Sequence, residues 1–137
     1  MSGGGGGTWN WVASDVVFAI HDRQLAEHSG MDGIRDPGMV ESALARPAHL
    51  ARYRDPDAAD LAAAYAYGIA KNHGFLDGNK RTAWVTARLF LADNGRRLEF
   101  DPADAIRTME GVASGRVSET ELADWFRSHM TLHMCQD

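Results

Sequence analysis

Apolar residues recur at helical spacing along much of this chain, and polar capping residues mark where the runs begin. Between residues 57 and 72, Leu61, Tyr65 and Ile69 stand four positions apart, which places them on one face of an α-helix. Asp57 precedes this run at the position of an N-cap. The run is also rich in alanine, so the pattern predicts a helix against which a neighbouring helix can pack closely.

Two helices are expected before this one. The first covers residues 14–30, beginning at a serine or aspartate that can cap it and ending near a glycine. The second has Asp36 at its N-cap and Pro37 at the first helical position, a place that proline favours. Because proline lacks the N–H group that continues a helix, Pro47 is expected to close this second element.

Three further helices are expected after it. Residues 82–95 are apolar nearly all round, which predicts a central, buried helix ended by asparagine and glycine. Residues 101–110 repeat the aspartate-proline start, and residues 118–130 open with a capping box. Residues 97–100 could form a brief extended piece, but nothing in the pattern supports a sheet. The pattern as a whole predicts an all-α bundle.

Size and composition agree with an ordinary globular protein. The chain has 137 residues, about one domain's worth, with 45% apolar and 24% charged residues. Residues 1–8 are mostly glycine and are expected to form a flexible tail, which leaves residues 9–137 as a single domain. The longest apolar run, Leu61 to Ala70, is shorter than the roughly 18 residues of a membrane span. With no secretory leader and a single cysteine, the chain is expected in the cytoplasm.

The charge distribution narrows the kind of ligand. A formal net charge of −5 argues against a general nucleic-acid-binding protein, since such proteins carry a basic surface for the phosphates. Four cations nevertheless gather around one polar stretch: Lys71, Lys80, Arg81 and Arg88. Local cations on an acidic background indicate a small anionic ligand or one charged partner.

The polar stretch, KNHGFLDGNKRTAW, lies between two predicted helices and combines several groups that phosphate chemistry requires. Gly78 and Asn79 form a turn that leads into a helix, so backbone N–H groups and the positive end of the helix dipole would face an anion. Arg81 on the first turn can add charge-assisted hydrogen bonds, which favours phosphate as that anion. A carboxylate beside a phosphate is unfavourable unless a cation lies between them, so Asp77 indicates Mg²⁺.

His73 completes the set, because an imidazole can accept a proton from an attacking hydroxyl at neutral pH. Taken singly, these residues also fit structural roles: His73 as a helix C-cap, Asp77 as part of a turn, and Asn79 as an N-cap. Lys80 and Arg81 fit such a role less well, because two cations at a helix N-terminus oppose the dipole unless an anion is near. The stretch therefore favours phosphoryl-type transfer.

Residues 73–82, HGFLDGNKRT, resemble the signature of the Fic/Doc family, and in particular of its death-on-curing (Doc) toxin branch. The likeness continues in IHD at residues 20–22, in GIRDPGMVESALARP at residues 33–47, and on either side of the signature. It covers nearly all of residues 9–130. The resemblance implies a compact six-helix Fic-type bundle, with the active-site loop between two central helices.

The resemblance also implies roles for single residues. His73 would be the base that activates a hydroxyl of a target protein, and Asp77 would be the acid that coordinates Mg²⁺. Gly78 and Asn79, with the amides of the following helix, would form the anion hole, and Arg81 would bind phosphate. Members of the family move either AMP or a phosphate from ATP onto the target.

Lys80 bears on the choice between AMP and phosphate. Most AMP-transferring members have glycine there, which lets the phosphates approach the backbone, whereas lysine adds bulk and charge. In the Doc branch, which has this lysine, the resemblance implies a reversed nucleotide that presents its γ-phosphate. The implied activity is a protein kinase that acts on a translation elongation factor. AMP transfer and a non-catalytic nucleotide- or partner-binding module are the alternatives.

Two departures from the family pattern concern control of the activity. Many members have proline where this chain has Gly74, and the glycine is expected to loosen the loop. Self-inhibited members carry serine or threonine four residues before a glutamate, whereas Glu110 of the single Glu-Gly pair has Ile106 at that position. An antitoxin protein is therefore expected to inhibit the chain in trans. Contact with a membrane or with nucleic acid is not expected.

Overall fold

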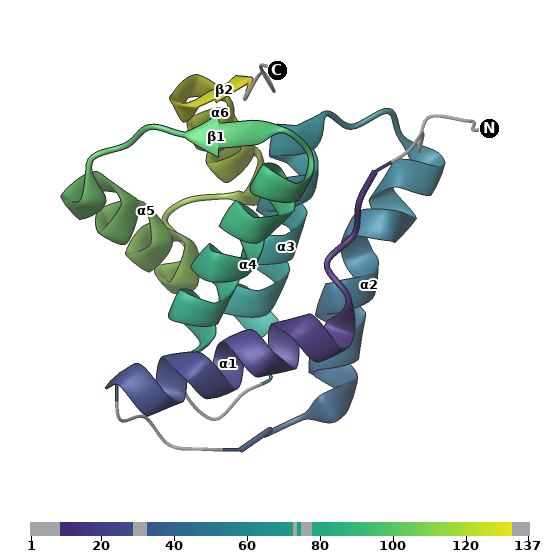
Figure 1. The fold of residues 1–137 in the computed structure, drawn as a ribbon, viewed down its shortest axis with the longest axis vertical. Helices are drawn as coiled ribbons and strands as arrows, with labels where there is room; N and C mark the ends of the chain where they lie inside the picture. The colour runs from purple at the N-terminus through teal and green to yellow at the C-terminus, as the bar shows by residue number, and fades with distance from the viewer. Residues whose placement is uncertain (1–8, 29–32, 73, 75–77, 133–137) are drawn as a thin grey trace.

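The computed structural model describes residues 9–28, 33–72, 74 and 78–132 of the chain. This part contains six helices and two short strands (Figure 1). They are α1 (Ser14–His28), α2 (Pro37–Tyr53), α3 (Ala58–Asn72), α4 (Asn79–Asp93), β1 (Arg96–Leu98), α5 (Pro102–Ser114), α6 (Glu119–His129) and β2 (Met130–Leu132). The predicted helical bundle is confirmed. None of the described helices is both long and apolar enough to cross a membrane.

Helix α3 forms the centre of the fold and packs against α2, α4, α5 and α6. Eleven of its fifteen residues are buried, and seven of these are alanines. Gly68 faces α2, where a Cβ atom would come within 3.3 Å of the Cβ atom of Ala43. Figure 1 shows α3 between α2 and α4. Small side chains thus let several helices approach α3 closely, as its alanine-rich sequence predicts.

Helix α4 lies beside α3 but is not the central, fully buried helix that its apolar sequence predicts. One face is buried, through Thr82, Ala83, Thr86, Ala87, Phe90 and Leu91. Arg81 and Arg88 are exposed. Helix α3 has eleven buried residues against six in α4, so α3 takes the central position. Helix α1 packs against α4 and buries Val17, His21 and Leu25, which recur every four residues.

Helix α2 begins as predicted but continues past Pro47. The Asp36 side chain accepts a hydrogen bond from the N–H of Met39 at 3.2 Å, which confirms the predicted N-cap. Pro47 lies inside the helix, which ends only at Tyr53, so the expectation that it closes the element is wrong. A proline removes one backbone hydrogen bond. Burial of Pro47 and of Ala51, which follows it, holds the last turns in place.

The two strands form a small antiparallel ribbon. Arg96 pairs with Leu132 and Leu98 with Met130. The sequence predicted an extended piece in this region but no sheet, and the second expectation is wrong. The pairing joins segments far apart in the chain, so no local pattern indicates it.

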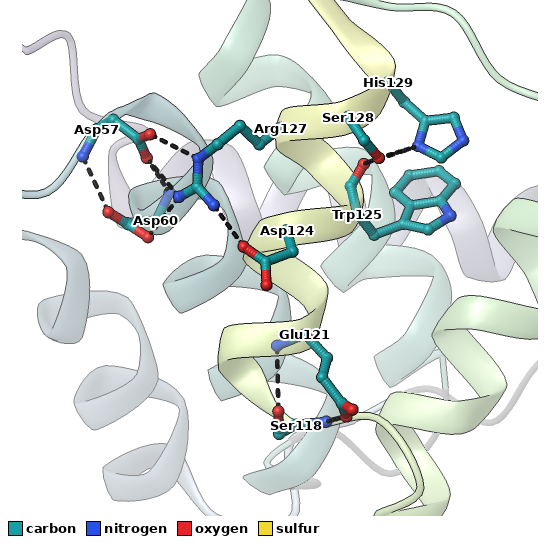
Figure 2. A network of polar contacts seen from close by, with 9 residues as sticks. All are labelled: Asp57, Asp60, Ser118, Glu121, Asp124, Trp125, Arg127, Ser128 and His129. Atoms are coloured by element: carbon teal, nitrogen blue, oxygen red, sulfur yellow. Dashed lines mark hydrogen bonds and ion pairs between the residues drawn. The ribbon is translucent and has the colours of Figure 1, made fainter.

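Arg127, near the end of α6, contacts three carboxylates (Figure 2). Its Nε lies 2.8 Å from Asp57, and its two Nη atoms lie 2.9 Å from Asp60 and 2.6 Å from Asp124. Asp57 also accepts a hydrogen bond from the N–H of Asp60 at 2.9 Å, which confirms its predicted capping role. The hydrogen bonds from Arg127 lower the pKa of Asp57 to about 2. This network ties the end of α6 to the start of α3.

The network predicts a pH-dependent contribution to stability. The folded-state pKa of Asp57 is about 2 against an ordinary value of 3.8, so its stabilising contribution is complete above the ordinary value and is lost as pH falls toward the folded value. In Asp57→Asn, the free energy of unfolding should fall by about 1 kcal/mol or less at neutral pH, because the groups are largely exposed. Urea unfolding at neutral pH and near pH 3 measures both the loss and the reduced pH dependence.

Glu27→Gln is the matched control, since it removes one carboxylate from the exposed Arg23–Glu27 pair within α1. This variant should keep the wild-type loss of stability on acidification. An Asp57→Asn variant with the wild-type pH dependence would show that the network is not its source.

Candidate functional site

A cavity of about 940 Å³ lies between α4 and α5. Figure 1 shows α5 beside the lower end of α4 and slanting away from it to the upper left. One end of this cleft is polar and is lined by Gly78, Asn79, Lys80 and Arg81 at the start of α4. Further along α4 the lining is mostly apolar and includes Trp84 and Phe100, with Arg88 among them. Helix α5 lines the cleft with Pro102, Ala105, Ile106, Met109, Glu110 and Ala113. The cleft therefore has room for a ligand that is charged at one end and apolar at the other.

The polar end brings together four residues that the sequence singles out. Gly78 is buried, Asn79 is half-buried, and Lys80 and Arg81 are exposed. All four line the same cleft. The predicted phosphate-binding residues thus lie side by side at one helix start, where backbone N–H groups and the helix dipole favour an anion.

Gly78 gives this helix start its shape. Its φ of 78° lies in the left-handed region, which glycine adopts at little cost. As the N-cap residue of α4 it offers no side-chain hydrogen bond, and its carbonyl accepts the N–H of Thr82 at 2.9 Å. The first turn of α4 therefore starts without a side-chain cap and carries Lys80 and Arg81.

Helix α1 supports Gly78 from the other side. His21 is only 2% exposed, and its ring lies 3.6 Å from where a Cβ atom on Gly78 would stand. Leu25, one turn later, lies at the same distance from that point. From the sequence, His21 is only part of the IHD segment at residues 20–22, and no role is predicted for it. Its spacing of four residues from both Val17 and Leu25 is the signal that places it on the buried face of α1.

Gly74 is held by the start of α2. Its carbonyl accepts hydrogen bonds from the N–H groups of Arg35 and Asp36, at 2.8 and 3.0 Å. A Cβ atom on Gly74 would collide with the Val40 side chain and come within 3.1 Å of the backbone nitrogen of Val40. At residue 74 glycine therefore allows a close, hydrogen-bonded approach to the start of α2. The expectation that Gly74 loosens the loop stays a prediction, since the neighbouring residues 73 and 75–77 lie outside the described residues.

The predicted base and the predicted metal ligand, His73 and Asp77, lie outside the described residues. Among the residues that the structure describes, no group of three or more His, Cys, Asp or Glu side chains could hold a metal ion. The described part of the site thus contains the residues predicted to bind an anion, and the anion-binding, proton-transfer and metal-binding roles stay predictions.

The apolar end of the cleft contains aromatic rings from distant parts of the chain, so no local sequence pattern predicts their contacts. The ring of Trp84 meets Phe100 edge-on, with centroids 5.2 Å apart, and stacks on buried Phe126 at 6.2 Å. Trp125 contacts both Trp84 and Phe100. Its indole N–H donates to Asp104 of α5 at 2.9 Å, which fixes that wall of the cleft. These residues come from three separate parts of the chain.

The residues at the polar end of the cleft also belong to a segment that matches a known protein family. Residues 11–91, which include α1, α2, α3, the polar end of the cleft and most of α4, match the Fic/DOC family. The chain belongs to the Fic/Doc family. The resemblance of the HGFLDGNKRT signature to this family is thereby confirmed, and the six described helices are consistent with a Fic/Doc fold.

Two relatives place this Fic/Doc protein near the Doc branch. It is 32% identical to "Protein kinase doc" of Escherichia phage P1 over 117 residues, which cover 85% of this chain and 92% of the relative. It is 42% identical to "Toxin Doc" of Mycolicibacterium smegmatis over 85 residues, which cover 59% of this chain and 65% of the relative. The Doc relatives therefore agree with the branch that the signature predicted.

The two left-handed glycines at the ends of α4 allow a matched test of the polar end. Gly78 and Gly95 have φ values of 78° and 76°, and Gly95 has no atom within 4 Å of where its Cβ would stand. Gly78→Ala and Gly95→Ala should each lower the free energy of unfolding by about 1 kcal/mol, the cost of this conformation for alanine. Only Gly78→Ala should also weaken ATP binding, since it alone distorts the polar end. Urea unfolding and ATP titration by calorimetry measure the two effects, and equal ATP affinities would contradict the assignment.

Proposed function

We propose that this Fic/Doc protein is an ATP-dependent kinase of the Doc type, which transfers a phosphate to a hydroxyl of a protein target. The observation that carries the proposal is the polar end of the cleft, where Gly78, Asn79 and Arg81 line a cavity of about 940 Å³. This volume lies within the range of small-molecule sites, roughly 300–1,000 Å³. Similarity to a relative named as a protein kinase supports the same reaction.

The reaction assigns each residue one task. His73, which follows the last residue of α3, would take the proton from the target hydroxyl as its oxygen attacks the γ-phosphorus. The new phosphorus–oxygen bond forms while the bond from the γ-phosphorus to the β–γ bridging oxygen breaks, and ADP leaves. Arg81 and the N–H groups at the start of α4 would stabilise the charge on the phosphate oxygens.

Asp77 would hold Mg²⁺ beside these phosphates. The residues fit this ion, because Mg²⁺ commonly takes one or two carboxylates and completes its shell with phosphate oxygens and water. It therefore does not need the larger set of side chains that is absent from the described residues. When bound, Mg²⁺ would supply charge neutralisation to the phosphates.

Lys80 favours transfer of phosphate over transfer of AMP. It is the second residue of α4, it is exposed, and it lines the cleft beside Arg81. A side chain there occupies space through which glycine would let the backbone approach a nucleotide's inner phosphates. Because the Lys80 side chain takes up this space, the terminal phosphate of ATP, and not an inner phosphate, would lie at the polar end.

A toxin role and its control complete the proposal. One Doc relative is named as a toxin. For this chain we infer a cytoplasmic toxin that phosphorylates a translation elongation factor and is inhibited in trans by an antitoxin protein. The absence of a Ser or Thr four residues before Glu110 supports inhibition by a separate chain.

The mass of the modified target distinguishes the reactions. Incubation with Mg²⁺, ATP and a purified elongation factor should add about 80 daltons for a phosphate, whereas AMP transfer would add about 329 daltons. His73→Ala should abolish the addition, because the target hydroxyl then has no base. Intact-protein mass spectrometry reads both outcomes directly.

His49→Ala is the control, since His49 is exposed on α2 and does not line the cleft. It should modify the target as the wild type does. An AMP adduct, or a phosphate adduct made equally well by His73→Ala, would overturn the proposed mechanism. A lysate treated with enzyme tests for other targets by the same mass shifts.

Growth of a bacterial host tests the inhibition in trans. Expression of the wild-type chain should arrest growth, and expression of His73→Ala should not. Co-expression of the antitoxin encoded beside the toxin should restore growth and yield a complex that copurifies. If no neighbouring gene product relieves the arrest, control by a separate antitoxin is wrong.

A further inference from the structure

We propose that the far end of the cleft is a nucleobase-binding subsite formed by Trp84, Phe100 and Arg88, which we call the aromatic corner. The inference rests on the proposed function in one respect, namely that the phosphates of the same nucleotide occupy the polar end. It adds the residues that would recognise the base, and it gives the nucleotide a direction along α4.

The two ends of the cleft are separated along the axis of α4. Asn79, Trp84 and Arg88 all line the cavity. With a rise of 1.5 Å per residue, Trp84 lies about 7.5 Å and Arg88 about 13.5 Å along the helix axis from Asn79. An elongated ligand with phosphates at one end and a flat ring at the other could therefore contact both ends.

The rings of the aromatic corner are held in place before any ligand binds. Phe126, which is fully buried, stacks behind Trp84 with an interplanar angle of 17°. Trp125 meets Trp84 at 64°, and Phe100 meets it at 81°. Trp84 and Phe100 nevertheless remain half-buried and line the cleft. A fixed aromatic surface that still reaches the cleft is suited to stacking, because bases bind to aromatic rings and to arginine planes.

Arg88 adds a charge that a purely apolar partner would not require. Its guanidinium carbon lies 5.8 Å from the ring centre of Trp84 and 5.2 Å from that of Phe100. Within the described ranges, none of the ion pairs involves Arg88. An exposed arginine over aromatic rings can cover a stacked base and attract the phosphates attached to it.

The α5 wall of the cleft also presents apolar side chains, which a helix of another protein could contact. Ile106 is 59% exposed, and Met109 lines the cavity beside it. The base is the better-supported occupant, because Arg88 takes part in none of the described ion pairs and the aromatic corner is continuous with the polar end. Glu110 of α5 is the one acid among the described residues that line this cavity. A protein segment at this end is an outcome that the test below would reveal.

The spacing of these residues along α4 also bears on the direction in which the nucleotide lies. If the γ-phosphate lies at the polar end, two further phosphates and the ribose separate it from the base. The base then reaches the aromatic corner, more than one helical turn along α4. The position of Trp84 and Arg88 therefore agrees with a nucleotide that presents its terminal phosphate.

Binding of ATP and of inorganic tripolyphosphate separates the two ends of the cleft. In the full-length chain, Trp84→Leu keeps an apolar side chain but removes the stacking surface. It should weaken ATP binding about tenfold, within the range of one base–aromatic stack, and leave tripolyphosphate binding unchanged. Trp84→Phe should restore ATP affinity to within about threefold of wild type. Titration calorimetry measures both ligands, and circular dichroism checks that each variant is folded.

If Trp84→Leu fails to fold, Arg88→Gln still tests the subsite. Arg88 is exposed, so its replacement should leave the fold intact. It should weaken ATP binding more than tripolyphosphate binding. Arg97→Gln, which changes an exposed arginine on β1 outside the cleft, should change neither.

Two results would overturn the nucleobase subsite alone. One is wild-type ATP affinity in both Trp84→Leu and Arg88→Gln, and the other is an equal loss of ATP and tripolyphosphate binding in these variants. If they bind ATP normally but no longer bind the antitoxin, the aromatic corner is a protein-binding surface instead. A wild-type chain that binds neither ATP nor tripolyphosphate would overturn the proposed kinase function itself, and the subsite with it.

Discussion

Close packing around α3 is the constraint on which the rest of this structure depends. Seven buried alanines, and Gly68 against Ala43, let α2, α4, α5 and α6 all lie against one helix. A larger side chain at these positions would overpack the core, which typically costs 1–3 kcal/mol, and would push a neighbour outward. Two of those neighbours, α4 and α5, are the walls of the cleft. The width of the cleft is therefore set in part by the small residues of α3, one of which, Ala70, lines the cavity itself.

The two described residues of the loop between α3 and α4, Gly74 and Gly78, are contacted by different helices. Gly74 accepts two hydrogen bonds from the segment that leads into α2, and Gly78 rests against His21 and Leu25 of α1. Both contacts exploit the absence of a Cβ atom, although for different reasons: Gly74 needs space beside Val40, whereas Gly78 needs a left-handed φ. The position of the polar end thus depends on where α1 and α2 lie, and both are placed by the core.

Local features of the sequence predicted local features of the structure. Asp36, Asp57 and Ser118 cap helices as expected, because a cap depends on residues only three positions away. The polar end was also predictable, since its residues are consecutive. Three features that the sequence left open or predicted wrongly depend on long-range packing. They are the central position of α3, the continuation of α2 past Pro47, and the pairing of β1 with β2. The apolar end of the cleft belongs to this second group, since it unites side chains of α4 and α5 with Phe100, which precedes α5.

The start of α4 departs from the rules that the other helices follow. Side chains of Asp36, Asp101 and Ser118 cap α2, α5 and α6, whereas α4 begins at Gly78 with no side-chain cap and no acid in its first turn. A glycine N-cap costs only about a few tenths of a kcal/mol relative to a capping side chain. The larger departure is the pair of cations, which the positive end of the helix dipole repels. A bound phosphate would offset this repulsion, because its charge neutralises the cations and lies at the positive end of the helix dipole. The unfavourable placement of two cations at this helix start and the anion binding that we propose for it therefore have the same physical origin, and a violation of local rules at this point is what a functional site leads one to expect.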